Sequence, residues 1–148
     1  MTFKPADPNF AERVRDSFSR QAFMRYLDAS LTKIEPGYCE IRMPYRPELT
    51  QQHGFFHAGT TAAIVDSACG YAAFGLMPAD ASVLTVEYKI NLLSPGRGQV
   101  MVARGHVIRN GRTLKICRGE AFGVTNGEET RCVESLSTIM TLVGREDR

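Results

Sequence analysis

The chain has 148 residues, of which 43% are hydrophobic and 23% charged, and its formal net charge at pH 7 is +2. This length and composition predict one globular domain over residues 1–148 and exclude an intrinsically disordered chain. The small net charge predicts no nucleic-acid partner. The four cysteines form no Cys-x-x-Cys pair, which favours reduced thiols over disulfides or zinc. The polar N-terminal stretch contains no apolar signal segment, so we expect a cytoplasmic location.

The first third of the chain predicts a helix followed by a hairpin. Apolar residues recur every four positions over residues 10–26, which is typical of one helical face; they are Phe10, Val14, Phe18, Ala22 and Tyr26. Two alternating runs, residues 30–35 and 38–43, flank Pro36 and Gly37 and predict a β-hairpin. Residues 45–52 are interpreted as a loop because of Pro44 and Pro47.

A long apolar segment then contains a single carboxylate. Between residues 58 and 79 the only acidic or basic side chain is Asp66, set among small and apolar residues. A helix that is apolar nearly all round is normally buried. Its glycines, hydroxyl residues and Asp66 make it too polar for a bilayer span, so no membrane association is expected. Burying one carboxylate costs several kcal/mol or raises its pKa, so Asp66 needs a functional reason.

The second half of the chain predicts strands. Runs rich in Val, Ile, Leu and Thr cover residues 82–93, 99–109, 113–125 and 130–143, separated by SPGRG, RNGR and TNGEE. The Asn-Gly pairs at positions 110 and 126 indicate tight hairpin turns. We therefore predict a four-stranded antiparallel meander. With the first hairpin it makes an α+β fold, in which six curved strands wrap one long helix beside a short N-terminal helix.

This order of elements, with His-x-Gly opening the long helix and Asp66 two turns inside it, resembles the hotdog-fold acyl-CoA thioesterases of the phenylacetate-pathway (PaaI-like) type. The likeness is strongest over residues 54–70, with support from NLLSPGRG at 91–98 and RNGRTL at 109–114. Family members typically read His-Gly-Gly where this chain has His57, Ala58 and Gly59. The resemblance implies an acyl-CoA substrate, a dimer at minimum, and commonly a tetramer built from two dimers.

Thioester hydrolysis needs donors for the developing oxyanion, a base or nucleophile, and a positioned water. Free N–H groups at a helix start suit the first role, so we predict the amides of Ala58 and Gly59. Asp66 suits the second, either as general base or as direct nucleophile. Asp66 lies eight residues after Ala58, or about 12 Å along one helix. If both act, the site must combine the helix start of one subunit with Asp66 of a partner.

Other candidates follow from the resemblance. Thr85 matches a position that helps orient the water, although β-propensity alone would explain a strand threonine. Gln51 can polarise the thioester or hold Asp66, and it can equally be an ordinary loop residue. Cations for the coenzyme A phosphates are expected on two turns, at Arg97, Arg109 and Arg112. Substrate contacts are expected in the segments that carry the resemblance, from His57, Phe56, Asn91, Ser94 and Pro95.

Several alternatives remain. His53 and His57 have the spacing of metal ligands, but Gly54 and the helix start lie between them, so we expect neither a metal nor any other cofactor. The tract over residues 69–98 resembles bacterial hydrolases of medium and long fatty acyl-CoA, which makes these the favoured substrates, with an aryl-acetyl group as the alternative. A hydratase that uses a histidine base and a non-catalytic acyl-CoA-binding protein are the other candidates.

Overall fold

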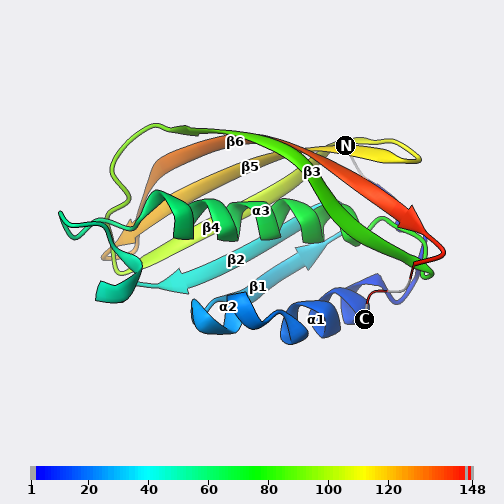
Figure 1. The fold of residues 1–148 in the computed structure, drawn as a ribbon, viewed down its shortest axis with the longest axis horizontal. Helices are drawn as coiled ribbons and strands as arrows, with labels where there is room; N and C mark the ends of the chain where they lie inside the picture. The colour runs from blue at the N-terminus through cyan, green and yellow to red at the C-terminus, as the bar shows by residue number, and fades with distance from the viewer. Residues whose placement is uncertain (1–2, 146, 148) are drawn as a thin grey trace.

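The computed structural model describes residues 3–145 and 147, which form a curved sheet around one long helix (Figure 1). In chain order the elements are α1 (Phe10–Arg20), α2 (Ala22–Tyr26), β1 (Ser30–Glu35), β2 (Tyr38–Pro44), a 3₁₀ turn η1 (Pro47–Leu49), α3 (Ala58–Phe74), β3 (Ala81–Leu92), β4 (Val100–Asn110), β5 (Leu114–Thr125) and β6 (Glu128–Val143). The predicted α+β class, six antiparallel strands and buried long helix are confirmed.

The strand order of the sheet is β1-β2-β4-β5-β6-β3, and all neighbours are antiparallel. The predicted four-stranded meander is therefore wrong at its first strand, because β3 pairs with β6 and lies at the edge of the sheet. Residues 93–99 carry the chain from β3 past the ends of β6 and β5 to β4, about three strand spacings or 14 Å. The hydrogen bond from Gln99 N to Val124 O, at 2.8 Å, holds this connection across the end of β5.

The hairpins predicted around Gly37, Asn110 and Asn126 are all present. Gly37, with φ at 78°, occupies the left-handed position of the β1–β2 turn. Asn126 and Gly127, with φ at 52° and 85°, form the two-residue β5–β6 turn typical of Asn-Gly. At the remaining hairpin, Asn110 is the last residue of β4 and residues 111–113 make the connection. The predicted hairpin is present there too, since Asn110 pairs with Lys115 in antiparallel strands, but its connection is three residues long.

The N-terminal segment is two helices rather than the single helix predicted over residues 10–26. Gln21 is extended (φ −74°, ψ 100°) and separates α1 from α2. The predicted apolar face holds in α1, where Val14 is fully buried, but fails beyond the break, where Tyr26 is 62% exposed. Met24 and Leu27, which widen the apolar face in the sequence, are buried. The break at Gln21 orients α2 so that Met24 and the following Leu27 reach the core while Tyr26 faces solvent.

Helix α3 crosses the concave face of the sheet and contacts β2 to β6 (Figure 1). Its residues Ile64, Ala68, Cys69 and Phe74 are fully buried. Gly105 of β4 permits this close packing, since a Cβ there would lie 2.3 Å from the carbonyl oxygen of Ala68. Among the described helices, none is both long and apolar enough to cross a bilayer.

Replacing Gly105 with alanine should lower the free energy of unfolding by about 1–3 kcal/mol, because the added methyl group pushes α3 away from β4. Gly70→Ala is the matched control. A Cβ at Gly70 would meet no atom within 4 Å, and alanine favours the helical conformation by about 0.5–1 kcal/mol. Urea unfolding of both variants measures the difference. Equal midpoints would contradict the close approach at Gly105.

Candidate active site

The start of α3 has one backbone amide engaged and one free. The Nδ1 atom of His57 accepts a hydrogen bond from Gly59 N at 2.9 Å and so caps the helix. The carbonyl of His57 accepts from the amides of Thr60 and Thr61. Within residues 3–145 and 147, the amide of Ala58 has no acceptor. Of the two predicted oxyanion donors, Ala58 therefore offers a free N–H, whereas that of Gly59 is held by His57.

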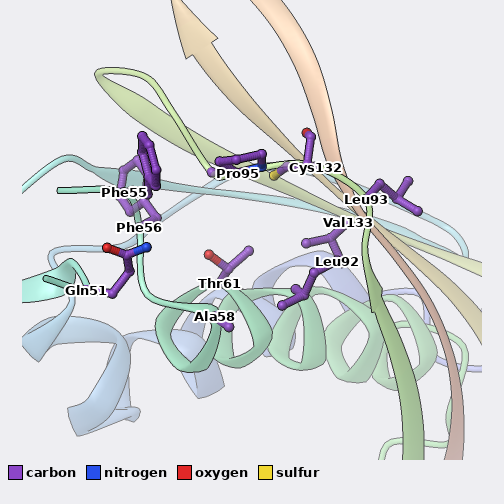
Figure 2. Close-up of a pocket in the computed structure, with 12 residues that line it drawn as sticks. Gln51, Phe55, Phe56, Ala58, Thr61, Leu92, Leu93, Pro95, Cys132 and Val133 are labelled. Carbon is purple, nitrogen blue, oxygen red and sulfur yellow. The ribbon is translucent and has the colours of Figure 1, made fainter. Parts of the chain in front are cut away.

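Ala58 opens into a pocket of about 480 Å³. Figure 2 shows its labelled side chains converging above the first turn of α3. The pocket brings together five residues predicted from the sequence: Gln51, Phe56, Ala58, Ser94 and Pro95. The hydrogen bond from Phe56 N to Gly96 O, at 2.9 Å, holds the Ser94–Pro95 turn against the helix start.

Gln51 has a fixed orientation at this pocket. Its side-chain oxygen accepts a hydrogen bond from His53 N, and its backbone amide donates to Phe55 O at 2.9 Å. Because the oxygen is engaged, the Nε2 group remains as a donor. Gln51 can therefore donate a hydrogen bond to a carbonyl bound near Ala58.

Asp66 lies beside a different pocket. The Oγ1 atom of Thr85 donates to Asp66 Oδ1 at 2.9 Å. Burial raises the pKa of Asp66 above its ordinary value, and this hydrogen bond opposes the rise. No lysine or arginine of the described residues pairs with Asp66. A carboxylate held with no cation beside it suits a base better than a structural ion pair.

The pocket beside Asp66 has a volume of about 360 Å³ and shares no lining residue with the pocket beside Ala58. Its walls come from α1, α3 and β3, together with Asp147 near the C-terminus. Ala58 and Asp66 therefore face separate openings, in agreement with their expected separation of about 12 Å along α3. A single chain therefore does not bring Ala58 and Asp66 into one pocket.

The three predicted arginines are not together in one chain. The guanidinium of Arg97 lies 4.5 Å above the ring of Phe55, which lines the pocket beside Ala58. Arg109 lines a different hollow, with Leu114 and Ile116, at the other end of β4. The 11 residues of β4 span about 36 Å, so Arg97 lies far from both Arg109 and Arg112.

Two other residues predicted to contact substrate, Asn91 and Ser94, make hydrogen bonds to other protein groups. Asn91 Oδ1 accepts from Lys89 Nζ at 2.8 Å, and Asn91 lines neither of the pockets beside Ala58 and Asp66. Ser94 Oγ donates to Arg131 O at 3.1 Å while lining the pocket beside Ala58. Among the described residues, no group of three or more His, Cys, Asp or Glu side chains could hold a metal ion. All four cysteines are buried and unpaired.

Sequence reasoning missed several residues of the pocket beside Asp66. These are Ser17, Gln21, Ser67 and Gly70. The signal for Gly70 was available, because it follows Asp66 by four residues and so lies on the same helical face. Ser17 and Gln21 carried no such signal, since only tertiary packing brings the α1 region to α3.

The relation between Asp66 and Thr85 gives a prediction for the pH dependence of hydrolysis. A base must be ionised, so kcat/KM should rise through the elevated pKa of Asp66, above the ordinary aspartate range. Thr85→Val removes a hydrogen bond that favours the carboxylate and should move this acid limb to higher pH. Thr138→Val is the matched control, since Thr138 donates to the Glu87 carboxylate on the outer face of the sheet. An acid limb in Thr85→Val identical to wild type would contradict the assignment.

Comparison with known proteins identifies the family. The thioesterase superfamily profile matches residues 53–130. A solved thioesterase family protein from Silicibacter pomeroyi superposes with a TM-score of 0.90 at 47% identity, covering 91% of this chain and 99% of that one. The E. coli PaaI protein, from the phenylacetic acid degradation operon, shares the fold with a TM-score of 0.83 at 15% identity, covering 95% and 99%.

A curated relative from Saccharolobus solfataricus, named "Putative esterase SSO2140", is 32% identical over 90 residues. The match covers 61% of this chain and 64% of that relative, so it spans less than two thirds of the relative's length. The chain belongs to the thioesterase superfamily, and its six-stranded sheet around one long helix is the hotdog fold of the PaaI-like thioesterases.

Proposed function

We propose that this protein hydrolyses acyl-CoA thioesters to a free acid and CoA in a homodimer, with residues 1–148 acting as one catalytic domain. One observation carries the proposal: α3 presents a free amide at Ala58 and an uncompensated carboxylate at Asp66, each beside its own pocket. An oxyanion donor and a base are the two groups that thioester hydrolysis needs. Because the two groups lie beside separate pockets, the Ala58 amide of one subunit must act with the Asp66 carboxylate of a second subunit.

The edge strand β3 supplies the means of assembly. Its outer edge pairs with no strand of the described chain, and its exposed side chains include Leu84, Val86, Tyr88 and Leu92. A long apolar edge of this kind favours pairing with another strand. The start of β3 lines the pocket beside Asp66, and its last residue, Leu92, lines the pocket beside Ala58.

Antiparallel pairing of two β3 strands about a two-fold axis places the start of one strand beside the end of the other. The Asp66 pocket of each subunit then meets the Ala58 pocket of its partner. The same two-fold axis also brings together arginines that lie far apart within one chain. Arg109 and Arg112 lie at the end of the sheet where β3 begins, so in the dimer they approach the end of the partner's sheet that carries Arg97. Cations from both subunits can then bind the phosphates of one CoA. Two such dimers would make the tetramer that the family resemblance implies.

The proposed mechanism uses side chains, backbone and water alone. The thioester carbonyl accepts hydrogen bonds from Ala58 N and from Gln51 Nε2 of one subunit. Asp66 of the partner subunit removes a proton from water as it attacks the carbonyl carbon, or attacks directly to form an anhydride that water then cleaves. Thr85 holds the carboxylate in position through its 2.9 Å hydrogen bond. The tetrahedral intermediate collapses, and the thiolate of CoA leaves.

The favoured substrates are medium or long fatty acyl-CoA thioesters, with aryl-acyl-CoA as the alternative. Apolar side chains, including Phe55, Phe56, Leu92 and Val133, line most of the pocket beside Ala58. They suit the part of a fatty acyl or aryl-acyl group that adjoins the thioester. The hydratase alternative lacks support from the geometry. His57 Nδ1 is occupied as a helix cap, and His57 lines neither the pocket beside Ala58 nor the pocket beside Asp66.

Thiol release from a panel of acyl-CoA and acyl carrier protein thioesters tests the proposal. We expect hydrolysis of acyl-CoA by the wild-type protein, with the rate depending on the acyl group. Acyl-CoA binding without thiol release would instead indicate a non-catalytic binding protein. Hydration of enoyl-CoA without thiol release would indicate a hydratase. Sedimentation velocity on the same sample should show a dimer or tetramer, and a monomer would exclude the shared site.

A further inference from the structure

The recess beside Asp66 has polar walls that the hydrolytic mechanism does not use. Ser17 Oγ of α1 lies 3.4 Å from Tyr71 Oη of α3, and both side chains are buried. Ser67 Oγ donates to Gln21 Oε1 at 3.5 Å, at the break between α1 and α2. Both distances are long for hydrogen bonds that involve a hydroxyl group. These groups therefore retain capacity for a better partner inside the recess.

Gly70 keeps the recess open. It lies one helical turn after Asp66 and lines the same pocket of about 360 Å³. A Cβ at this position would meet no atom within 4 Å, so packing does not require the glycine. A glycine inside a helix normally weakens it. Here the missing side chain leaves space in the pocket that Gly70 lines together with Asp66, Ser17 and Tyr71.

The charges around the two pockets differ, and this difference indicates which pocket receives the acyl group and which receives CoA. The charged residues that line the recess are Asp66 and Asp147, and Asp147 is paired with Arg20 at 2.8 Å. The pocket beside Ala58 has Arg97 at its edge, stacked on Phe55. The polyanionic nucleotide of CoA is therefore favoured on the Arg97 side, and an uncharged group is favoured in the recess.

We propose that the recess is the acyl subsite, and that Ser17, Gln21 and Tyr71 select acyl groups with an uncharged hydrogen-bonding group, such as a hydroxyl, at the far end. This inference rests on the proposed function and narrows its substrate class. Burial raises the pKa of Tyr71, so its hydroxyl stays protonated as a donor. An unsubstituted alkyl end would displace water from these groups without replacing its hydrogen bonds. A terminal carboxylate would face the negative charge of Asp66.

The test compares ω-hydroxyacyl-CoA with unsubstituted acyl-CoA of equal chain length, by thiol release. We expect wild-type kcat/KM to favour the hydroxylated member of the best pair by about tenfold. In the double variant Ser17→Ala/Tyr71→Phe this ratio should fall towards one. Removing both hydroxyls together leaves neither without its partner, which protects the fold. Tyr26→Phe, which alters an exposed phenol on α2, is the matched control and should keep the wild-type ratio.

A second variant tests the path of the acyl group independently. Gly70→Leu fills the recess and should reduce kcat/KM for the hydroxylated acyl-CoA by at least tenfold, with a much smaller effect on acetyl-CoA. Two results would overturn the inference and leave the proposed function standing: equal wild-type hydrolysis of both members of every pair, or equal losses on acetyl-CoA and long acyl-CoA in Gly70→Leu. Absence of thiol release from every thioester by the wild-type protein would overturn both.

Discussion

Asp66→Asn should lower kcat/KM for thioester hydrolysis by about a thousandfold, within the range that general-base groups contribute. Asparagine keeps the shape of the side chain and can still accept the hydrogen bond from Thr85, so the fold and the oligomeric state should be retained. Thiol release and sedimentation velocity on the purified variant measure both properties. Turnover close to that of wild type would exclude Asp66 as base or nucleophile.

The same substitution should increase the free energy of unfolding at neutral pH. The pKa of Asp66 is raised in the folded state by burial, so the native protein binds a proton more readily than the unfolded chain does. As pH rises from the ordinary aspartate value through this raised pKa, the wild-type protein therefore loses stability relative to Asp66→Asn. Thermal unfolding of both proteins at acid and neutral pH checks this. The gain in Asp66→Asn should be largest at neutral pH and should vanish below the ordinary aspartate pKa.

Ala58→Pro should lower kcat by about 10²–10³, the usual effect of removing one oxyanion donor. Proline at the first position of a helix removes the amide hydrogen and leaves the helical hydrogen bonds intact. His57 already has the extended conformation that proline requires of its preceding residue (φ −64°, ψ 138°). The structure therefore accommodates this substitution, and the loss should appear in turnover rather than in stability.

Ala58→Gly is the matched control for this variant, because it keeps the amide hydrogen and loses only the methyl group. It should retain most of the wild-type turnover and be somewhat less stable. If proline and glycine had equal effects on kcat, the amide of Ala58 would not be the oxyanion donor.

Much of the architecture could be predicted from sequence because it rests on local patterns. The alternation of β5 and β6, the Asn126-Gly127 turn and the apolar surroundings of Asp66 each identify one element. The position of β3 could not be predicted in this way, since alternation identifies a strand but not its neighbour. Nor could the break at Gln21, where the burial of Met24 and Leu27 overrides an apolar spacing that continues without interruption.

In the candidate site, too, local patterns could place some residues and could not place others. Ala58 and Asp66 could be placed relative to one another because both lie on one regular helix. The capture of the Gly59 amide by His57 depends on a side-chain orientation that spacing does not give. The separation of Arg97 from Arg109 follows from the length of β4. Ser17 and Gln21 reach Asp66 through packing between distant segments, which no local pattern reports.

The central claim is that each active site combines Ala58 of one subunit with Asp66 of the other, and a mixed dimer tests it most directly. Subunits carrying Ala58→Pro and Asp66→Asn would be coexpressed with different affinity tags, and the heterodimer purified through both tags. One of its two sites then carries both substitutions and the other carries neither. We predict about half of the wild-type turnover per dimer, although each parent homodimer is nearly inactive. A heterodimer no more active than its parents would show that both groups act within one subunit, and would contradict the shared site.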